Sequence, residues 1–277
     1  MPIVNVQLKA IERYAKKLHD HPIYLAAELG NKPPANVRFI GLLPEESGFI
    51  ESRIAALKYI QESDPTVRAV LMLQDDFWID RPIVDSEWNE ALKMMNESDT
   101  VKSIRLMPCP GPNSRPINPK TLGVLPEGWY NAEQYYDSYD MSGVPESDFV
   151  EITNNDLYMF TFQASLWNPD ACIEFLTEIL ESAKVEFKAL GLPSSDWNRW
   201  CICHNVAENM SGQNIFSKTS LGISKKHMSI IRRGDHSNAV NLATIPYRPT
   251  AVFQGKLEPW AKEFAIREGF DHLPGWY

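Results

Sequence analysis

The sequence has few cysteines and no cysteine framework. It contains four cysteines among 277 residues, at positions 109, 172, 201 and 203. Disulfide frameworks are typical of short, cysteine-dense chains, so we expect free thiols and a cytoplasmic location. Residues 201–204 read Cys-Ile-Cys-His, but the paired cysteines of zinc sites stand roughly two to four residues apart and need a second pair elsewhere. Buried thiols that pack as small apolar groups are therefore favoured over a zinc site.

The sequence also lacks an excess of positive charge and a long apolar segment. Lys and Arg total 27 against 36 Asp and Glu, a net charge of −9, whereas nucleic-acid binding through bulk charge needs a basic face. The amino-terminal residues have no basic n-region followed by an apolar stretch. The apolar run at residues 69–73 is far shorter than the roughly 18 residues of a membrane-spanning helix. We expect no nucleic-acid partner and no membrane span.

The sequence does contain enough large apolar residues for a globular core. The chain has 12 Phe, 10 Tyr and 8 Trp, and 44% of its residues are hydrophobic. So many large apolar groups exclude an intrinsically disordered chain. A chain of this length buries enough surface to fold without disulfides or structural metals.

The apolar spacing alternates between strand and helix along the first third of the chain. It predicts a helix over residues 3–19, strands over 22–27 and 37–43, a helix over 47–63 and a buried strand over 69–73. This order is typical of a doubly wound α/β protein with a mostly parallel central sheet flanked by helices. The continuous apolar run at 69–73 predicts a central strand. Further elements are predicted at 88–95, 101–106, 157–162, from 169 after an Asn168 cap, from 194 toward 210, at 250–253 and at 259–268.

Two adjacent acids stand where the third predicted strand ends. Residues 70–77 read Val-Leu-Met-Leu-Gln-Asp-Asp-Phe. Open α/β sheets bind ligands outside the carboxyl ends of their strands. Asp75 and Asp76 repel each other unless solvent or a cation compensates, and carboxylate oxygens suit Mg²⁺ or Mn²⁺. The spacing alone leaves two alternatives open, a metal site or an exposed strand end with solvated acids.

Four segments resemble the GT-A-type glycosyltransferases, which use sugar nucleotides in bacterial or viral glycan synthesis. Residues 71–77 resemble the family's strand that ends in a DXD-like acidic motif, with Gln74 where a first acid is expected. Residues 158–167 resemble the strand and turn on the acceptor side. Residues 194–200 resemble the helix start that carries the catalytic base, and 252–257 resemble a closing Gly-Lys segment. The resemblance spans roughly residues 22–270.

The resemblance implies one GT-A-like, Rossmann-like domain over residues 1–277. Residues 22–106 would form the nucleotide-sugar-binding half, and 107–277 the acceptor-binding half with the carboxyl-terminal segment. The implied reaction is a metal-assisted transfer of a hexosyl or deoxyhexosyl group from a nucleoside-diphosphate donor to a hydroxyl of a glycan acceptor. The transfer is either inverting or retaining, and an Asp general base favours inversion. Mn²⁺ or Mg²⁺ would be the cofactor. Asp76 is the implied metal ligand, Asp75 contacts the ribose or the metal, and His236 is a further candidate ligand.

Candidates for the remaining roles come from position along the chain. Asp196, at a predicted helix start, is the first choice for the general base, although capping that helix is the alternative role. Glu208, farther along the same predicted helix, is the second choice. Glu28 and Glu45 follow the first two strands, where the ribose and base of a nucleotide would approach.

Basic and aromatic side chains complete the candidate set. The leaving diphosphate needs positive groups, and the basic residues either supply them or form a solvated surface. The aromatic residues either stack on sugar rings or belong to the core. The basic candidates are His227, Arg232, Arg233, His236 and Lys256; the aromatic candidates are Trp129, Tyr130, Tyr135, Tyr136 and Trp167.

Two other functions use the same residues. A metal-dependent phosphoesterase or nucleotidyltransferase would place the Asp75–Asp76 pair on a phosphate-bearing substrate and add further acidic ligands. A non-catalytic carbohydrate-binding protein would keep the fold and lose the chemistry, as the Gln74 substitution allows.

Overall fold

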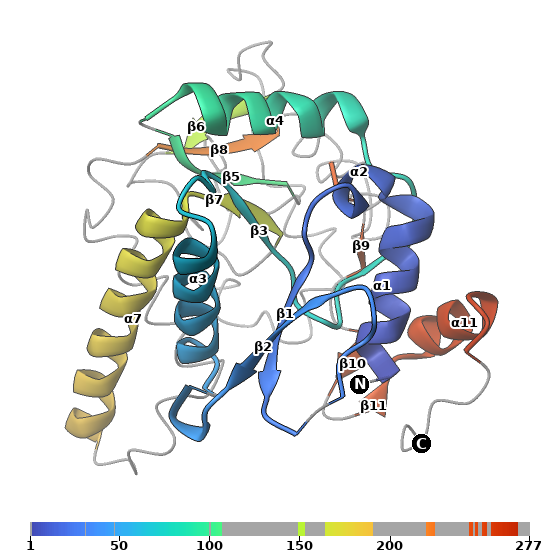
Figure 1. Cartoon of the computed structure of the whole chain (residues 1–277), viewed down its shortest axis with the longest axis horizontal. Helices are drawn as coiled ribbons and strands as arrows, with labels where there is room; N and C mark the ends of the chain where they lie inside the picture. The colour runs from blue at the N-terminus through green and yellow to red at the C-terminus, as the bar shows by residue number, and fades with distance from the viewer. Residues whose placement is uncertain are drawn as a thin grey trace, which may run out of the picture.

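A computed structural model describes residues 2–30, 32–46, 48–99, 101–106, 149–152, 164–190, 220–224, 244–245, 247–248, 251–253 and 256–270. These residues form a mixed α/β arrangement (Figure 1). In chain order the elements are α1 (Pro2–Tyr14), α2 (Lys16–His19), β1 (Tyr24–Glu28), β2 (Arg38–Leu42), the 3₁₀ helix η1 (Pro44–Glu46), α3 (Glu51–Ser63), β3 (Val70–Met72), β4 (Trp78–Ile79), α4 (Asp85–Glu97), β5 (Val101–Arg105), β6 (Phe149–Ile152), β7 (Ser165–Trp167), α7 (Pro169–Leu190), β8 (Ser220–Ser224), β9 (Tyr247–Arg248), β10 (Val252–Phe253), β11 (Lys256–Leu257) and α11 (Pro259–Arg267).

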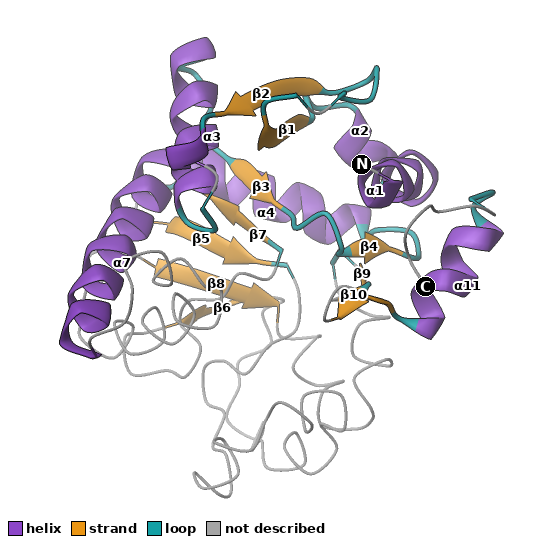
Figure 2. Ribbon diagram, turned by 90° about the horizontal axis from the view of Figure 1, so that it is seen from below, coloured by secondary structure: helices purple, strands orange, loops and turns teal. Residues whose placement is uncertain are grey.

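The largest sheet has five strands in the order β3-β7-β5-β8-β6. Strand β7 runs antiparallel to both β3 and β5, and β6 runs antiparallel to β8. Only β5 and β8 are parallel neighbours within this sheet. Strands β1 and β2 form a separate parallel pair, with Tyr24 opposite Arg38. Figure 2 shows this pair beside β3, so that the strands follow one another as β2, β1, β3, β7, β5, β8, β6.

The predicted mostly parallel central sheet is therefore wrong for the described strands. Parallel neighbours need a crossover connection, usually a helix. Local apolar spacing predicts the strands but not their direction, which is set by pairing between distant segments, as between Ser103 of β5 and Trp167 of β7. The prediction of a central strand at residues 69–73 is wrong for the hydrogen-bonded sheet, although β1 lies on the other side of β3 (Figure 2). Strand β3 pairs only with β7 among the described strands and forms one edge of the five-stranded sheet.

The helices follow the apolar spacing of the sequence. Helix α3 carries the predicted stripe, with Ile50, Leu57 and Ile60 buried, and it ends at the Asp64-Pro65 break. Helix α7 starts as predicted, because the Asn168 side chain accepts a hydrogen bond from the Ala171 N–H at 3.0 Å. The buried stripe of α7 is also the predicted one: Cys172, Phe175, Leu176, Ile179 and Leu180.

Helices cover both sides of the sheet. Helices α3 and α7 pack against each other on one side, and α4 lies on the other, against β5 and β7 (Figure 1). Helix α1 packs against β4 and shares a buried cluster with α11, through Val6, Trp78, Ala261 and Phe264. The amino- and carboxyl-terminal helices therefore close the same end of the molecule. The strand predicted at 157–162 and the helix predicted from 194 lie outside the described residues.

Candidate functional site

Asp75 and Asp76 form a turn between β3 and β4. The next residues, Phe77 and Trp78, are buried, so the chain turns back into the core and leaves the two acids at the strand end. Hydrogen bonds to the carbonyl groups of both acids hold the backbone of the turn. The Trp78 indole N–H donates to the Asp75 carbonyl at 3.1 Å, and the Ala251 N–H donates to the Asp76 carbonyl at 2.9 Å. The acidic turn thus has a fixed backbone, as a ligand site requires.

The carboxylates of this turn are costly to ionise. Burial raises the pKa of Asp76, and the negative charge of Asp75 raises it further. Hydrogen bonds from backbone N–H groups, including that of Val252, oppose this rise only in part, and the resulting pKa is about 6. Asp75 is exposed toward solvent on one side, yet the protein packed around its carboxylate also raises its pKa, against the opposing charge of Arg53. No ion pair between described residues includes either acid. A bound cation would lower this cost.

The two acids fit a divalent cation that is shared with a substrate. Carboxylate oxygens are the ligands that Mg²⁺ and Mn²⁺ prefer. Mg²⁺ commonly uses one or two carboxylates together with substrate phosphates rather than a complete protein cage. Within the described part of the chain, no group of three or more His, Cys, Asp or Glu side chains forms such a cage. His236, the third predicted ligand, lies outside the described residues.

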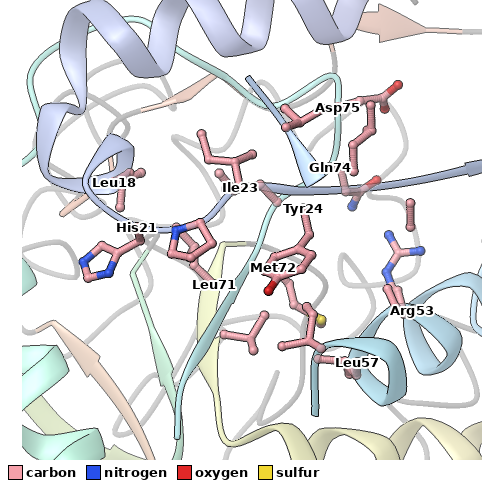
Figure 3. Close-up of a pocket in the computed structure, with 18 of the residues that line it drawn as sticks. Leu18, His21, Ile23, Tyr24, Arg53, Leu57, Leu71, Met72, Gln74 and Asp75 are labelled. Carbon is pink, nitrogen blue, oxygen red and sulfur yellow. The ribbon is translucent and has the colours of Figure 1, made fainter. Parts of the chain in front are cut away.

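A cavity of about 1060 Å³ opens between β1 and β3 and reaches the acidic turn. Besides these strands, its walls come from α1, from α3 and from α4, and most of its lining side chains are apolar. Figure 3 shows Gln74, Asp75 and Arg53 on one side of the cavity, with Leu18, His21, Ile23 and Leu71 on the other. The cavity therefore has a polar end beside the acidic pair and a mostly apolar body that also includes His21.

Arg53 is a site residue that the sequence analysis missed. It stands in the first turn of α3, lines the cavity and lowers the pKa of Asp75 by its positive charge. Its guanidinium lies 3.8 Å from the centre of the Phe49 ring and donates to the Phe49 carbonyl. A cation in the first turn opposes the helix dipole, which favours anions there. That unfavourable placement is a sequence signal that could have identified Arg53.

The predicted nucleotide-binding acids lie at the strand ends but not on the cavity. Glu28 is the last residue of β1 and Glu45 lies in η1 after β2; both are exposed, and neither lines the cavity. Lys256 is exposed in β11, opposite Phe253 of β10. Strand β10 directly follows Ala251, which bonds the acidic turn, so the segment bearing Lys256 lies near Asp76. The other predicted site residues lie outside the described residues: Asp196, Glu208, His227, Arg232, Arg233 and His236.

Trp167 is a core residue, so of the two roles considered for it the structure supports packing in the core and not stacking on an acceptor sugar. Its side chain is 2% exposed in β7 and stacks on Phe175 of α7, with ring centroids 6.1 Å apart. Burial between sheet and helix leaves no ring face for a sugar. Cys172 is a free, buried thiol 3.9 Å from the Met72 sulfur, as predicted for a packing thiol. The other aromatic candidates lie outside the described residues: Trp129, Tyr130, Tyr135 and Tyr136.

Comparison with known proteins gave no relative. No protein-family model matches the chain, and neither the curated proteins nor the solved structures include a significant match. Among the described residues, no helix is both long enough and apolar enough to cross a membrane.

Proposed function

We propose that the protein is a GT-A-type glycosyltransferase, with a metal-assisted nucleoside-diphosphate site at the end of β3. The observation that carries the proposal is the Asp75–Asp76 turn. The carbonyl groups of the two adjacent acids are hydrogen-bonded, both carboxylates have raised pKa values, and Asp75 lines a large cavity. Ionised carboxylates in such surroundings are stabilised by a cation, and a cation there can hold the phosphates of a donor.

The polar end of the cavity suits the leaving diphosphate. A bound divalent cation would neutralise part of the negative charge that builds on the diphosphate as the sugar departs. Arg53 supplies a positive charge at the same end, and the amino-terminal turn of α3, with Gly48 and Ser52 on the cavity wall, adds the positive end of a helix dipole. Lys256 lies on the segment that follows the contact of Ala251 with the acidic turn. These groups stabilise charge that develops during the reaction.

The transfer itself is a displacement at the anomeric carbon. The acceptor oxygen forms a bond to this carbon, the bond from the carbon to the diphosphate oxygen breaks, and a carboxylate takes the proton of the acceptor hydroxyl. The resemblance of residues 194–200 to the family's base-bearing helix start assigns this proton to Asp196, with Glu208 as the second candidate. An inverting outcome follows from a single displacement of this kind.

The alternatives use the same acids differently. A two-metal phosphoesterase would need further acidic ligands near Asp76. Of the nearest acids in sequence, Asp80 lies 3.5 Å from the guanidinium of Arg81, and Asp85 is exposed in the first turn of α4. The helix dipole of α4 stabilises Asp85, and Arg81 stabilises Asp80, so neither acid needs a metal ion to compensate its charge. The glycosyltransferase proposal needs neither of them.

Donor turnover tests the proposal. The protein is incubated with a panel of nucleotide sugars and Mn²⁺, and released nucleoside diphosphate and phosphate are measured, with Asp76→Asn and an EDTA sample as controls. Slow Mn²⁺-dependent release of nucleoside diphosphate by the wild-type protein alone is expected, because glycosyltransferases often hydrolyse their donors when no acceptor is present. Release of inorganic phosphate would instead indicate a phosphoesterase, and release of neither product would indicate a binding protein.

A further inference from the structure

Gln7 is a buried polar residue on the apolar face of α1. Its neighbours on that face, Ile3, Val6, Ala10 and Ile11, are buried. Gln7 is only 6% exposed, and neither its Oε1 nor its Nε2 has a hydrogen-bond partner among the residues that the structure describes. A buried amide without partners destabilises a protein, because it gives up its bonds to water and gains none. Such groups are rare in folded proteins, and each one calls for an explanation.

The cavity between β1 and β3 is the space nearest to Gln7 in which a ligand could supply the missing partners. Gln7 lines this cavity, together with Val4, Leu8 and Ile11 of the same helix. The same cavity extends to Asp75 and to Arg53. Gln7 and the polar side beside the acidic turn thus border one space, and a small movement of the buried carboxamide would bring it to a ligand there.

We propose that this cavity binds the nucleobase of the donor, and that the Gln7 carboxamide pairs with the edge of the base. The carboxamide presents one acceptor and one donor side by side. A heterocycle edge with a donor next to an acceptor, which every nucleobase has, forms hydrogen bonds with both groups of the carboxamide at once. Amide side chains form such pairs of two hydrogen bonds with bases. The inference rests on the proposed function and adds to it the residue that recognises the base.

The rest of the cavity matches the other parts of a nucleotide. Its apolar walls accept the two faces of a flat ring, and its polar end, with Arg53 and Asp75, accepts the diphosphate. A purely aliphatic ligand would fill the apolar body but leave the Gln7 amide without partners. This placement moves the base away from Glu28 and Glu45, which do not line the cavity.

Calorimetry with two variants of α1 tests the inference. UDP, GDP, CDP and ADP are titrated, with Mn²⁺ present, into the wild-type protein, Gln7→Leu and the control Asn5→Leu, which exchanges an exposed polar residue of the same helix. Pyrophosphate is titrated in parallel, since it lacks a base. We expect Gln7→Leu to lose about tenfold or more in affinity for the preferred nucleotide, to keep its affinity for pyrophosphate and, without ligand, to melt at a higher temperature than the wild type. Asn5→Leu should bind all ligands as the wild type does.

The outcomes separate the inference from the proposed function. Equal nucleotide affinity in the wild type and Gln7→Leu would overturn the role of Gln7 while leaving the glycosyltransferase proposal intact. A parallel loss of nucleotide and pyrophosphate affinity, with a lower melting temperature, would mean that Gln7 supports the fold, and would also overturn the inference. Failure of the wild-type protein to bind any of the four nucleotides would refute the proposed function, and the inference with it.

Discussion

The raised pKa of Asp76 predicts an unusual dependence of stability on pH. Asp76 ionises at about pH 6 in the folded protein, against 3.8 for an ordinary aspartate. Between these two values the native state binds more protons than the unfolded state, so the free energy of unfolding falls as pH rises through this window. At about 1.4 kcal/mol per pKa unit, the penalty above pH 6 amounts to at most about 3 kcal/mol. The penalty is small near pH 4 and vanishes only well below pH 3.8, where Asp76 is protonated in both states.

The substitution Asp76→Asn removes this penalty, because an amide of the same shape does not ionise. In EDTA, Asp76→Asn and the wild type should be about equally stable near pH 4, and the variant should be more stable at pH 7.5 by up to about 3 kcal/mol. With added Mn²⁺ at pH 7.5, the wild type should instead be more stable than Asp76→Asn. Metal binding requires the ionised carboxylate and stabilises the native state that holds it.

Urea unfolding at several pH values between 4 and 8, in EDTA and in Mn²⁺, measures both effects. Other titrating groups are common to the two proteins, so the difference between their curves isolates Asp76. A difference that does not change with pH would show that the carboxylate is well solvated. Equal stabilisation of both proteins by Mn²⁺ would place the cation elsewhere.

Three further predictions concern the base, the basic segment and the contact between the ends of the chain. Asp196→Asn should lower turnover by about 10²- to 10⁴-fold with unchanged donor affinity, whereas a wild-type rate in this variant and an inactive Glu208→Gln would move the role to Glu208. Lys256→Ala should weaken nucleoside-diphosphate binding more than nucleoside binding in calorimetry, and equal small effects would indicate a solvated lysine. Glu268 accepts hydrogen bonds from Arg13 at 2.8 Å and from Tyr14 at 3.0 Å; burial opposes these bonds, but they keep its pKa below the ordinary value. Glu268→Gln should therefore lower the free energy of unfolding, measured with urea at neutral pH, by about 1–3 kcal/mol. This loss should become smaller as the pH falls through the pKa of Glu268. An unchanged urea midpoint would show that the contact does not stabilise the protein.

The helices could be predicted from the sequence because their signals are local. The stripe of α3, the Asn168 cap of α7 and the Gly269 that follows α11, with its φ of +88°, each depend on residues within a few positions of one another. The order and direction of the strands could not be predicted in this way. Strand β7 is three residues long, and its antiparallel place between β3 and β5 is set by contacts across more than fifty positions of the chain.

The acidic turn was predictable and the cavity was not. Asp75 and Asp76 follow a continuous apolar run, which marks a strand end in the sequence itself. Gln7 and Arg53 stand inside helical patterns, where a polar residue is ordinarily solvated. They become candidate binding residues only because α1 and α3 border the space between β1 and β3. Trp167 shows the opposite case, because the sequence left open whether it stacks on a sugar or packs in the core, and the structure places it in the core.

The most direct test of the central claim, a cation-dependent diphosphate site at the end of β3, is calorimetry of nucleoside diphosphates with and without Mn²⁺. The account predicts that the wild-type protein binds its preferred nucleotide in Mn²⁺ and loses most of this affinity in EDTA. Asp76→Asn should bind weakly in both conditions while keeping its fold. Equal affinity in the wild type and Asp76→Asn, or affinity that does not depend on Mn²⁺, would contradict the assignment of the acidic turn.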